Sequence, residues 1–85
     1  MPQARTYEHS IDLPDPATRR ALRDMAGIPA YKLAARIGVA PSSIHAWERG
    51  DREPTGLQRQ AYRKALLRLA ENFPSKEGSK WLNDS

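Results

Sequence analysis

Apolar residues recur at helical spacing along four stretches of the chain, with polar residues between them. The pattern predicts amphipathic helices from residue 16 to about 26, from 29 or 30 to 37, from 41 to about 49, and over the apolar positions 57–73. Gly27 and Gly38 end the first two helices, since glycine readily takes the left-handed conformation that closes a helix. After Gly50 a polar turn leads to Pro54, which prevents simple continuation of the third helix. The chain is therefore expected to be all-α.

The first and fourth predicted helices have recognisable starts. Asp15 is a good N-cap, and Pro16 suits the first helical position, where its missing N–H is no loss. Thr55 and Gln58 have the spacing of a capping box. On the first helix the pattern predicts that Ala21, Leu22 and Met25 face the core. It predicts that Arg19, Arg20 and Asp24 face solvent. The fourth helix, about 17 residues and roughly 25 Å long, exceeds what a four-helix core needs, so either its later half supports a dimer contact or it breaks near Leu69.

Residues 33–54 contain two short helical patterns separated by a glycine, at the spacing of a helix-turn-helix. The helices of this motif cross at roughly 90 to 120° over a turn of about three or four residues, so the crossing needs small and apolar side chains. Ala34 supplies the small side chain and Gly38 the turn. Ile44 and Trp47, three residues apart, face the core from the second helix. The motif makes DNA the leading candidate partner.

The two ends of the chain lack this pattern. Residues 1–14 have alternating apolar positions in places and are expected to form a flexible or strand-like arm. Residues 74–85 are interpreted as a polar tail, except that Trp81 and Leu82 are expected to pack on the core or on a partner. The predicted division is an N-terminal arm at 1–14, a helix-turn-helix DNA-binding domain at 15–73 and a C-terminal tail at 74–85.

The composition argues against several classes of protein. The 85 residues suffice for one small domain, whose modest stability a dimer would increase. Without cysteine, and without a histidine and carboxylate cluster at ligand spacing, no metal or other cofactor is expected. No catalytic constellation or glycine-rich phosphate loop is evident, so we do not expect an enzyme. No signal-like or membrane-spanning apolar run is present, which predicts a soluble cytoplasmic protein with no membrane contact.

Positive charge is concentrated around the motif. The whole chain has a formal net charge of +4, whereas residues 16–68 hold eleven Lys and Arg against four Asp and Glu. Basic side chains here can neutralise phosphates, and each such contact adds a salt-dependent increment to affinity through counterion release. An ordinary solvated surface is the other interpretation of these charges.

Two groups of side chains are candidates for DNA contact. The helix expected at 41–49 presents small polar and basic residues that fit a major groove about 12 Å wide. The candidate base-reading residues are Ser42, Ser43, His45, Ala46 and Arg49, with Ala46 expected to touch a thymine methyl group. The candidate phosphate-binding residues are Tyr31, Lys32, Arg36, Pro41 and Arg52. His45 is interpreted as a polar contact, with a pH-sensitive switch or a metal ligand as alternatives.

From Leu22 to Leu69 the sequence resembles the Xre/Cro helix-turn-helix family, which includes phage repressors and many small bacterial regulators. The resemblance implies a bacterial or phage-encoded, nucleoid-associated protein. The resemblance rests on Leu22-Arg23 followed by Ala26-Gly27-Ile28, on Leu33-Ala34, Gly38-Val39 and Ile44, and on Trp47-Glu48-Arg49-Gly50 through Pro54. It implies a compact, lambda repressor-like bundle of four or five helices that binds operator DNA as a twofold dimer, with half-sites about 34 Å apart. It also implies a structural ion pair between Arg23 and Glu48.

The chain departs from the family pattern at three places. Pro29 and Ala30 replace a Ser or Thr cap and a following Gln, and Ala40 replaces the usual cap of the recognition helix. Pro41, Ser42 and Ser43 stand where Gln or Arg commonly reads bases. Discrimination is therefore expected to depend on Arg49, His45, Ala46 and DNA shape.

These features predict a sequence-specific transcriptional regulator, a repressor that occupies operator DNA as a homodimer. The alternative is a protein-interaction module, such as an antitoxin or a phage accessory protein. Such a module would bind a protein partner through the fourth helix and the Trp81 tail, with DNA binding secondary or absent.

Overall fold

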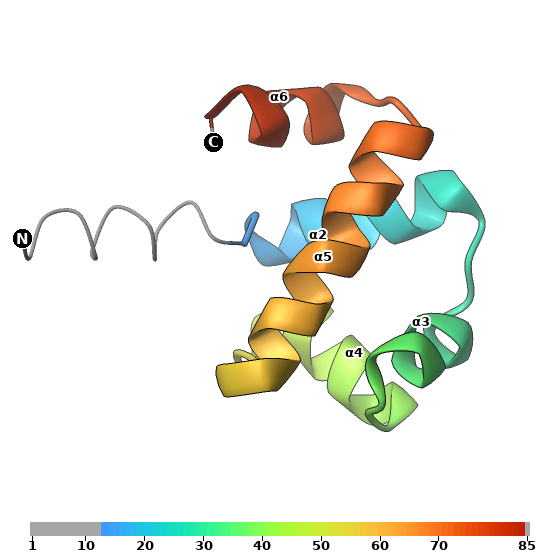
Figure 1. Cartoon of the computed structure of the whole chain (residues 1–85), viewed down its shortest axis with the longest axis vertical. Coiled ribbons are helices and arrows are strands. Elements are labelled where there is room, and N and C mark those ends of the chain that lie inside the picture. Colours follow the sequence, from blue (N-terminus) through green and yellow to red (C-terminus); the bar gives the residue numbers. More distant parts are fainter. Residues whose placement is uncertain (1–12, 85) are drawn as a thin grey trace, which may run out of the picture.

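The computed structural model describes residues 13–84, and within this range the chain forms five α-helices and no strand (Figure 1). The helices are α2 (Pro16–Ala26), α3 (Ala30–Ile37), α4 (Pro41–Arg49), α5 (Gly56–Asn72) and α6 (Lys76–Asp84). The long α5 crosses the molecule, with α3 and α4 towards one of its ends and α6 at the other. The predicted all-α bundle is confirmed. The predicted N-terminal arm lies outside the described residues, apart from its last two.

Local signals fix the ends of the first helices as the sequence predicts. The Thr18 amide donates a hydrogen bond of 3.1 Å to Asp15 Oδ1, which caps α2. Gly27 closes α2 with φ 68°, and Gly38 closes α3 with φ 90°. Both values are left-handed, so a residue with a β-carbon would be strained at either position.

The predicted capping box at the start of α5 is wrong. Thr55 is the N-cap residue, but its side chain makes no capping hydrogen bond. Gly56, which follows it, has a left-handed φ of 57°, so the chain enters the helix by a path that the capping-box spacing does not describe. Helix α5 is continuous to Asn72, without a break near Leu69.

The segment interpreted as a polar tail contains a helix that belongs to the core. Ser75 Oγ accepts a hydrogen bond of 3.0 Å from the Gly78 amide, and α6 begins at the next residue, Lys76. Gly78 lies so close to its neighbours that an added Cβ would stand 3.1 Å from Leu22 Cδ2. Trp81, 6% exposed, is part of the buried cluster. The tail therefore packs on the domain, one of the two outcomes expected for Trp81.

The core is one apolar cluster to which all five helices contribute. Its fully buried members include Leu22, Ile44, Tyr62 and Leu66. The Trp47 and Tyr62 rings lie with centroids 4.7 Å apart and planes tilted by 44°, a favourable geometry for an aromatic pair. The Tyr62 hydroxyl is buried and has no hydrogen-bond partner among the described residues.

Two expectations for α2 are wrong. Arg19, predicted to face out, is 4% exposed, and Met25, predicted to face in, is 54% exposed. The buried side of α2 consists of Arg19, Leu22 and Arg23, positions three and four residues apart. A hydrophobicity pattern assigns arginine to solvent, but a guanidinium can be buried where carboxylates and carbonyls accept all of its hydrogen bonds.

Candidate nucleic-acid interface

Helices α3 and α4 form the helix-turn-helix, with the turn at Gly38. Leu33 and Ala34 of α3 are each 1% exposed, and Ile44 and Trp47 of α4 are 0% and 3% exposed. These four side chains belong to the same buried cluster, so the inner side of α4 is anchored in the core. The sequence analysis places Ala34, Ile44 and Trp47 at this crossing, and their burial is confirmed.

Arg23 joins α2 to the end of α4. Its Nε and Nη2 donate to the two carboxylate oxygens of Glu48 at 2.6 and 2.8 Å, and its Nη1 donates to the Ile28 carbonyl at 3.0 Å. The side chains are 11% and 4% exposed. The hydrogen bond to Glu48 raises the pKa of the Arg23 guanidinium, against the opposing effect of burial. The structure thus brings together the two residues expected to form a structural ion pair, in a bidentate geometry.

Arg19 forms a second link between α2 and the region after α4. Its Nε donates to the Pro14 carbonyl at 2.7 Å, and its Nη1 donates to the Trp47 carbonyl at 3.0 Å. Nη1 and Nη2 also donate to the Glu53 carboxylate at 3.0 and 2.9 Å. Two arginines one helical turn apart on α2 therefore hold α4 and the loop that follows it.

The solvent side of α4 carries most of the predicted base-reading residues. Ser42, His45 and Arg49 are exposed, and Ser43 is half-buried. Arg49 Nε lies 2.7 Å from Asp51 Oδ2, and both side chains are more than half exposed. This pair forms in solvent, where an ion pair contributes little, so Arg49 can exchange Asp51 for another acceptor.

Ala46 differs from the other predicted base-reading residues, because it is 6% exposed. A side chain this buried does not present its methyl group to a thymine, so the structure speaks against the expected role of Ala46. Ser42, Ala46 and Arg49 stand four and three residues apart, a spacing that predicts one shared side of the helix. In the structure Ser42 and Arg49 are exposed on that side, whereas Ala46 is buried.

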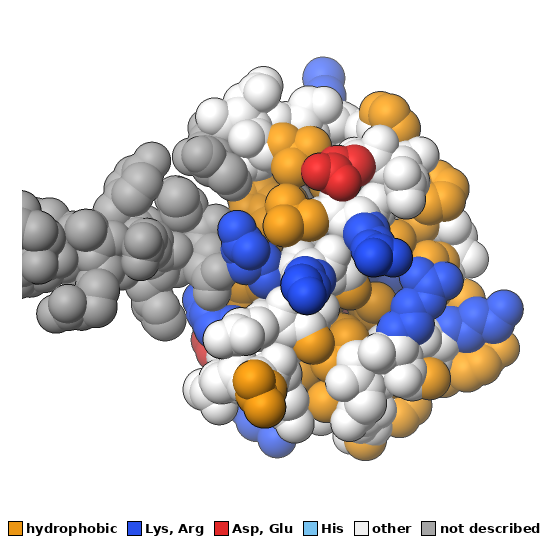
Figure 2. Space-filling view, in the orientation of Figure 1, with side chains coloured by type: hydrophobic (Ala, Val, Ile, Leu, Met, Phe, Trp, Pro, Cys, Tyr) orange, Lys and Arg blue, Asp and Glu red, His pale blue; other side chains and the backbone are white. Residues whose placement is uncertain are grey.

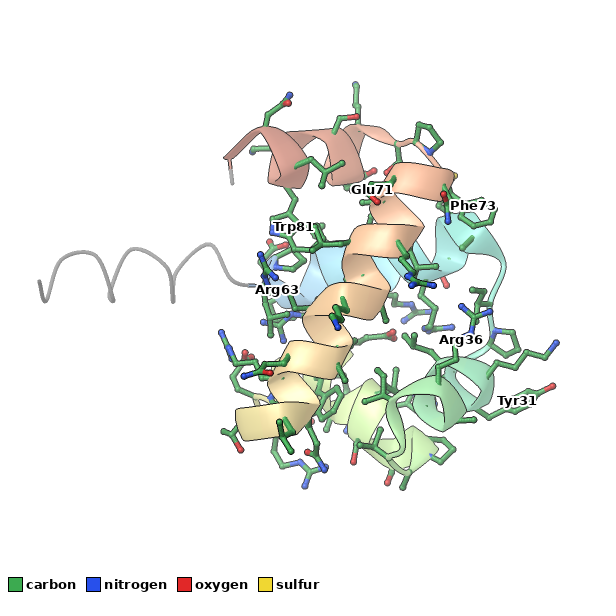
Figure 3. All side chains as sticks on the ribbon, in the orientation of Figure 1. Tyr31, Arg36, Arg63, Glu71, Phe73 and Trp81 are labelled. Carbon is green, nitrogen blue, oxygen red and sulfur yellow. The ribbon has the colours of Figure 1, made fainter. Side chains whose placement is uncertain are left out.

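The predicted phosphate-binding residues are all exposed. Tyr31 is 61% exposed, and its side chain points away from α3, as does that of Arg36 (Figure 3). Lys32, Pro41 and Arg52 are also exposed, and Arg52 Nη2 lies 3.4 Å from Ser43 Oγ. No side chain caps the start of α4, where Ala40 is the N-cap residue, so the positive end of its helix dipole is open to an anion.

Other kinds of site find little support. Within residues 13–84, no three or more His, Asp or Glu side chains gather as a possible metal site. In the same part of the chain, no helix has both the length and the apolar character needed to cross a membrane.

A helix-turn-helix family model matches residues 20–66, more than half of the chain. The chain belongs to the helix-turn-helix family. This family is typical of Xre, Cro and lambda repressor-like proteins, so membership supports a DNA-binding regulator. It is a family of DNA-binding regulatory proteins and not a family of enzymes. No curated protein and no solved structure matches the chain. The match begins within α2 and ends within α5, so α6 is a part of this helix-turn-helix protein beyond the matched region.

Sequence reasoning missed Arg19 and Glu53 as residues that support the motif. The available signal was the spacing of Arg19 and Arg23, which places two arginines on the same side of α2 as Leu22. Glu53, beside the buried Pro54, could have been recognised as an acceptor only once the loop was known to return to α2.

Proposed function

We propose that this helix-turn-helix protein is a sequence-specific transcriptional regulator that binds operator DNA as a homodimer and represses by occupying it. The observation that carries the proposal is the solvent side of α4. It presents small polar side chains and one arginine, while the opposite side of the same helix is fixed in the core through Ile44, Trp47 and the Glu48 ion pair. A rigidly held helix with such a surface suits the major groove.

The proposal divides the contacts by role. The residues that read base edges are Ser42, Ser43, His45 and Arg49, and those that hold phosphates are Tyr31, Lys32, Arg36 and Arg52, together with the start of α4 at Pro41. Arginine is the residue best suited to a guanine edge, because its guanidinium can donate two parallel hydrogen bonds to O6 and N7. Phosphate contacts set the position of α4 but carry no sequence information themselves.

Arg49 is the residue most able to discriminate bases, and it must give up its ion pair with Asp51 to do so. Opposite a guanine, the Arg49 guanidinium would leave the exposed Asp51 carboxylate and donate to the two guanine acceptors in a site that excludes water. Opposite another base, Arg49 would leave Asp51 without gaining two equivalent acceptors. Asp51 therefore competes with the DNA bases for the Arg49 guanidinium, and this competition weakens binding to non-cognate DNA most. The pair favours specificity over affinity.

Selection of bound sequences from a random duplex pool tests the proposal. A dimer of this fold is expected to select two inverted half-sites with centres about 34 Å, or one helical turn, apart. A single unrepeated motif would contradict the dimer, and failure to enrich any sequence would contradict sequence-specific recognition.

The second candidate function is that of a protein-interaction module that uses α5 and the Trp81 region. Trp81 is 6% exposed and belongs to the core, so it does not offer a free side chain to a partner. Leu57 at the start of α5 and Phe73 at its C-cap are large apolar side chains that are exposed, and they favour a protein contact there. A chain that enriches no DNA sequence would leave this second function as the better one.

A further inference from the structure

Helices α3 and α5 carry exposed positive charge that is not neutralised by a neighbouring carboxylate among residues 13–84. Near α4, Arg19 and Arg59 pair with Glu53, Arg23 with Glu48, and Arg49 with Asp51. Arg52, in the loop after α4, contacts Ser43 Oγ at 3.4 Å instead of a carboxylate. In contrast, four exposed basic residues on α3 and α5 have no ion-pair partner within residues 13–84: Lys32, Arg36, Lys64 and Arg68. We call these four residues the basic band.

The face of the molecule that α5 crosses carries several Lys and Arg side chains (Figure 2). Lys and Arg side chains gather over α5 and continue onto α3 (Figure 2). Helix α3 has no acidic residue and α5 has one, Glu71, near its C-terminal end (Figure 3). A surface with one sign of charge produces a field that attracts a polyanion over a distance of about a Debye length, roughly 8 to 10 Å at physiological salt.

The positions of these charges are unfavourable for the folded chain by itself. Lys32 and Arg36 stand four residues apart on α3, and Lys64 and Arg68 stand four residues apart on α5. Like charges at this spacing are neighbours on the helix surface and reduce its stability. Stability therefore does not explain either pair, whereas an anionic partner would.

The band and the base-reading side of α4 face different directions. His45 is exposed on α4, yet it is not visible on the face of the molecule that presents the band (Figure 2). Lys32 and Arg36 connect the two surfaces, since α3 packs against both α4 and α5. A straight duplex docked on α4 would leave Lys64 and Arg68 pointing elsewhere.

We infer that Lys64 and Arg68 contact the phosphates of duplex DNA outside the segment that α4 reads. The inference rests on the proposed function. The duplex could be flanking DNA of the same molecule, bent back along α3 towards α5, or a second DNA molecule. Both present the same phosphate chemistry, and the experiment distinguishes them.

The test compares the parent with the double variant Lys64→Gln and Arg68→Gln. The control is Lys76→Gln with Lys80→Gln, which removes the same charge from exposed positions on α6. Affinity for a duplex limited to the selected site and for one with long flanks is measured over a range of salt concentrations. Capture of a free duplex by bead-bound duplex measures bridging, and melting temperatures check that each variant is folded.

Two lost phosphate contacts reduce the slope of log affinity against log salt by about 2, because each contributes about 0.9. We expect this reduction, and a loss of about tenfold in affinity near 0.1 M salt, only on the long duplex or in the bridging assay. If the affinity of the parent rises with the length of the flanks and no free duplex is captured, the partner of Lys64 and Arg68 is flanking DNA. If a free duplex is captured, the partner is a second DNA molecule. The control is expected to match the parent.

Several results would overturn the inference and leave the proposed function standing. One is a salt slope of the double variant that equals that of the parent on every DNA. The others are a loss of affinity as large on the short duplex as on the long one, and a loss as large in the α6 control as in the double variant. If instead the parent selects no sequence at all, the proposed function fails, which is a separate result.

Discussion

Arg19 and Arg23 are the residues on which the position of α4 most depends. Each is nearly buried, each forms a bidentate ion pair, and each also donates to a main-chain carbonyl. Bidentate guanidinium contacts fix direction as well as distance. The two arginines therefore tie the end of the reading helix to α2.

Replacement of Arg23 by alanine tests this role. The Glu48 carboxylate, 4% exposed, would be left without its partner, so we expect a loss of about 3 to 5 kcal/mol in the free energy of unfolding, measured with urea. Arg20→Ala is the matched control on the same helix. It breaks an exposed pair with Asp24 of 3.4 Å and should cost less than about 1 kcal/mol. Similar losses for both variants would contradict a buried structural pair.

Tyr62 offers a test in the opposite direction. Its hydroxyl is buried without a partner among residues 13–84, and burial raises the pKa of the phenol, so the group stays neutral. Tyr62→Phe keeps the ring contact with Trp47 and removes the unsatisfied hydroxyl. We expect stability to be unchanged or higher by up to about 1 kcal/mol. A loss above that size in urea unfolding would show that the hydroxyl has a stabilising partner.

The residue scale also shows where sequence reasoning failed. The burial of Leu33, Ala34, Ile44 and Trp47 follows from their hydrophobicity and helical spacing. The burial of Arg19 does not, because it depends on acceptors 28 and 34 residues away, at Trp47 and Glu53. A local pattern carries no information about such partners.

At the scale of the elements, α2 and α5 begin in different ways. Asp15→Ala removes a side-chain cap and should cost about 1 kcal/mol, whereas Thr55→Ala removes none and should cost less than about 0.5 kcal/mol. Thermal melts of both variants at neutral pH measure the difference. A larger loss for Thr55→Ala would contradict the structure at the start of α5.

The cap of α2 should also depend on pH. Hydrogen bonding with Thr18 lowers the pKa of Asp15 from its usual 3.8. A lowered pKa of an acid stabilises the fold above the unfolded value, and this contribution is lost as the pH falls through the folded value. The stability difference between the parent and Asp15→Ala should therefore shrink between about pH 5 and about pH 2. A difference that is constant over this range would mean that the charged carboxylate is not the cap.

Helix α6 is not predicted from the sequence pattern, because its nine residues are mostly polar. Its contact with the domain depends on the buried Trp81 and on the close-packed Gly78. Trp81→Ala should cost about 3 to 5 kcal/mol in urea unfolding, since it removes a core side chain. Leu57→Ala, at a position 81% exposed, should change stability by less than about 0.5 kcal/mol. Equal effects would mean that α6 does not pack on the domain in solution.

Helix bounds and the motif could be predicted because their causes are local: caps, left-handed glycines and apolar spacing. The capping box predicted at Thr55 is wrong although α5 begins there, because the backbone enters the helix with Gly56 in a left-handed conformation. The placement of α6 could not be predicted, because it depends on contacts with residues distant in sequence, such as Leu22. Among the predicted site residues, exposure follows the pattern at Ser42, His45 and Arg49, but Ala46 lies at the covered edge of α4. In a helix of nine residues the buried and exposed sides adjoin each other, so helical spacing alone does not assign a residue at their boundary.

For the whole molecule, the arrangement of charge separates support from recognition. Carboxylates neutralise the arginines that hold α4, and the basic band on α3 and α5 adds positive charge beside the helix-turn-helix. Association with DNA would be driven by this field, and discrimination would come from the few side chains on α4. The two contributions respond differently to mutation and to salt.

The most direct test of DNA reading by α4 is the affinity of Arg49→Ala for the selected operator and for a scrambled duplex at fixed salt. Lys32→Ala and Arg20→Ala remove the same charge elsewhere. We expect Arg49→Ala to lose about 1 to 3 kcal/mol on the operator and much less on the scrambled duplex, because it removes a base contact. Lys32→Ala should weaken both duplexes alike, and Arg20→Ala neither. Equal operator affinity of Arg49→Ala and the parent would contradict the account.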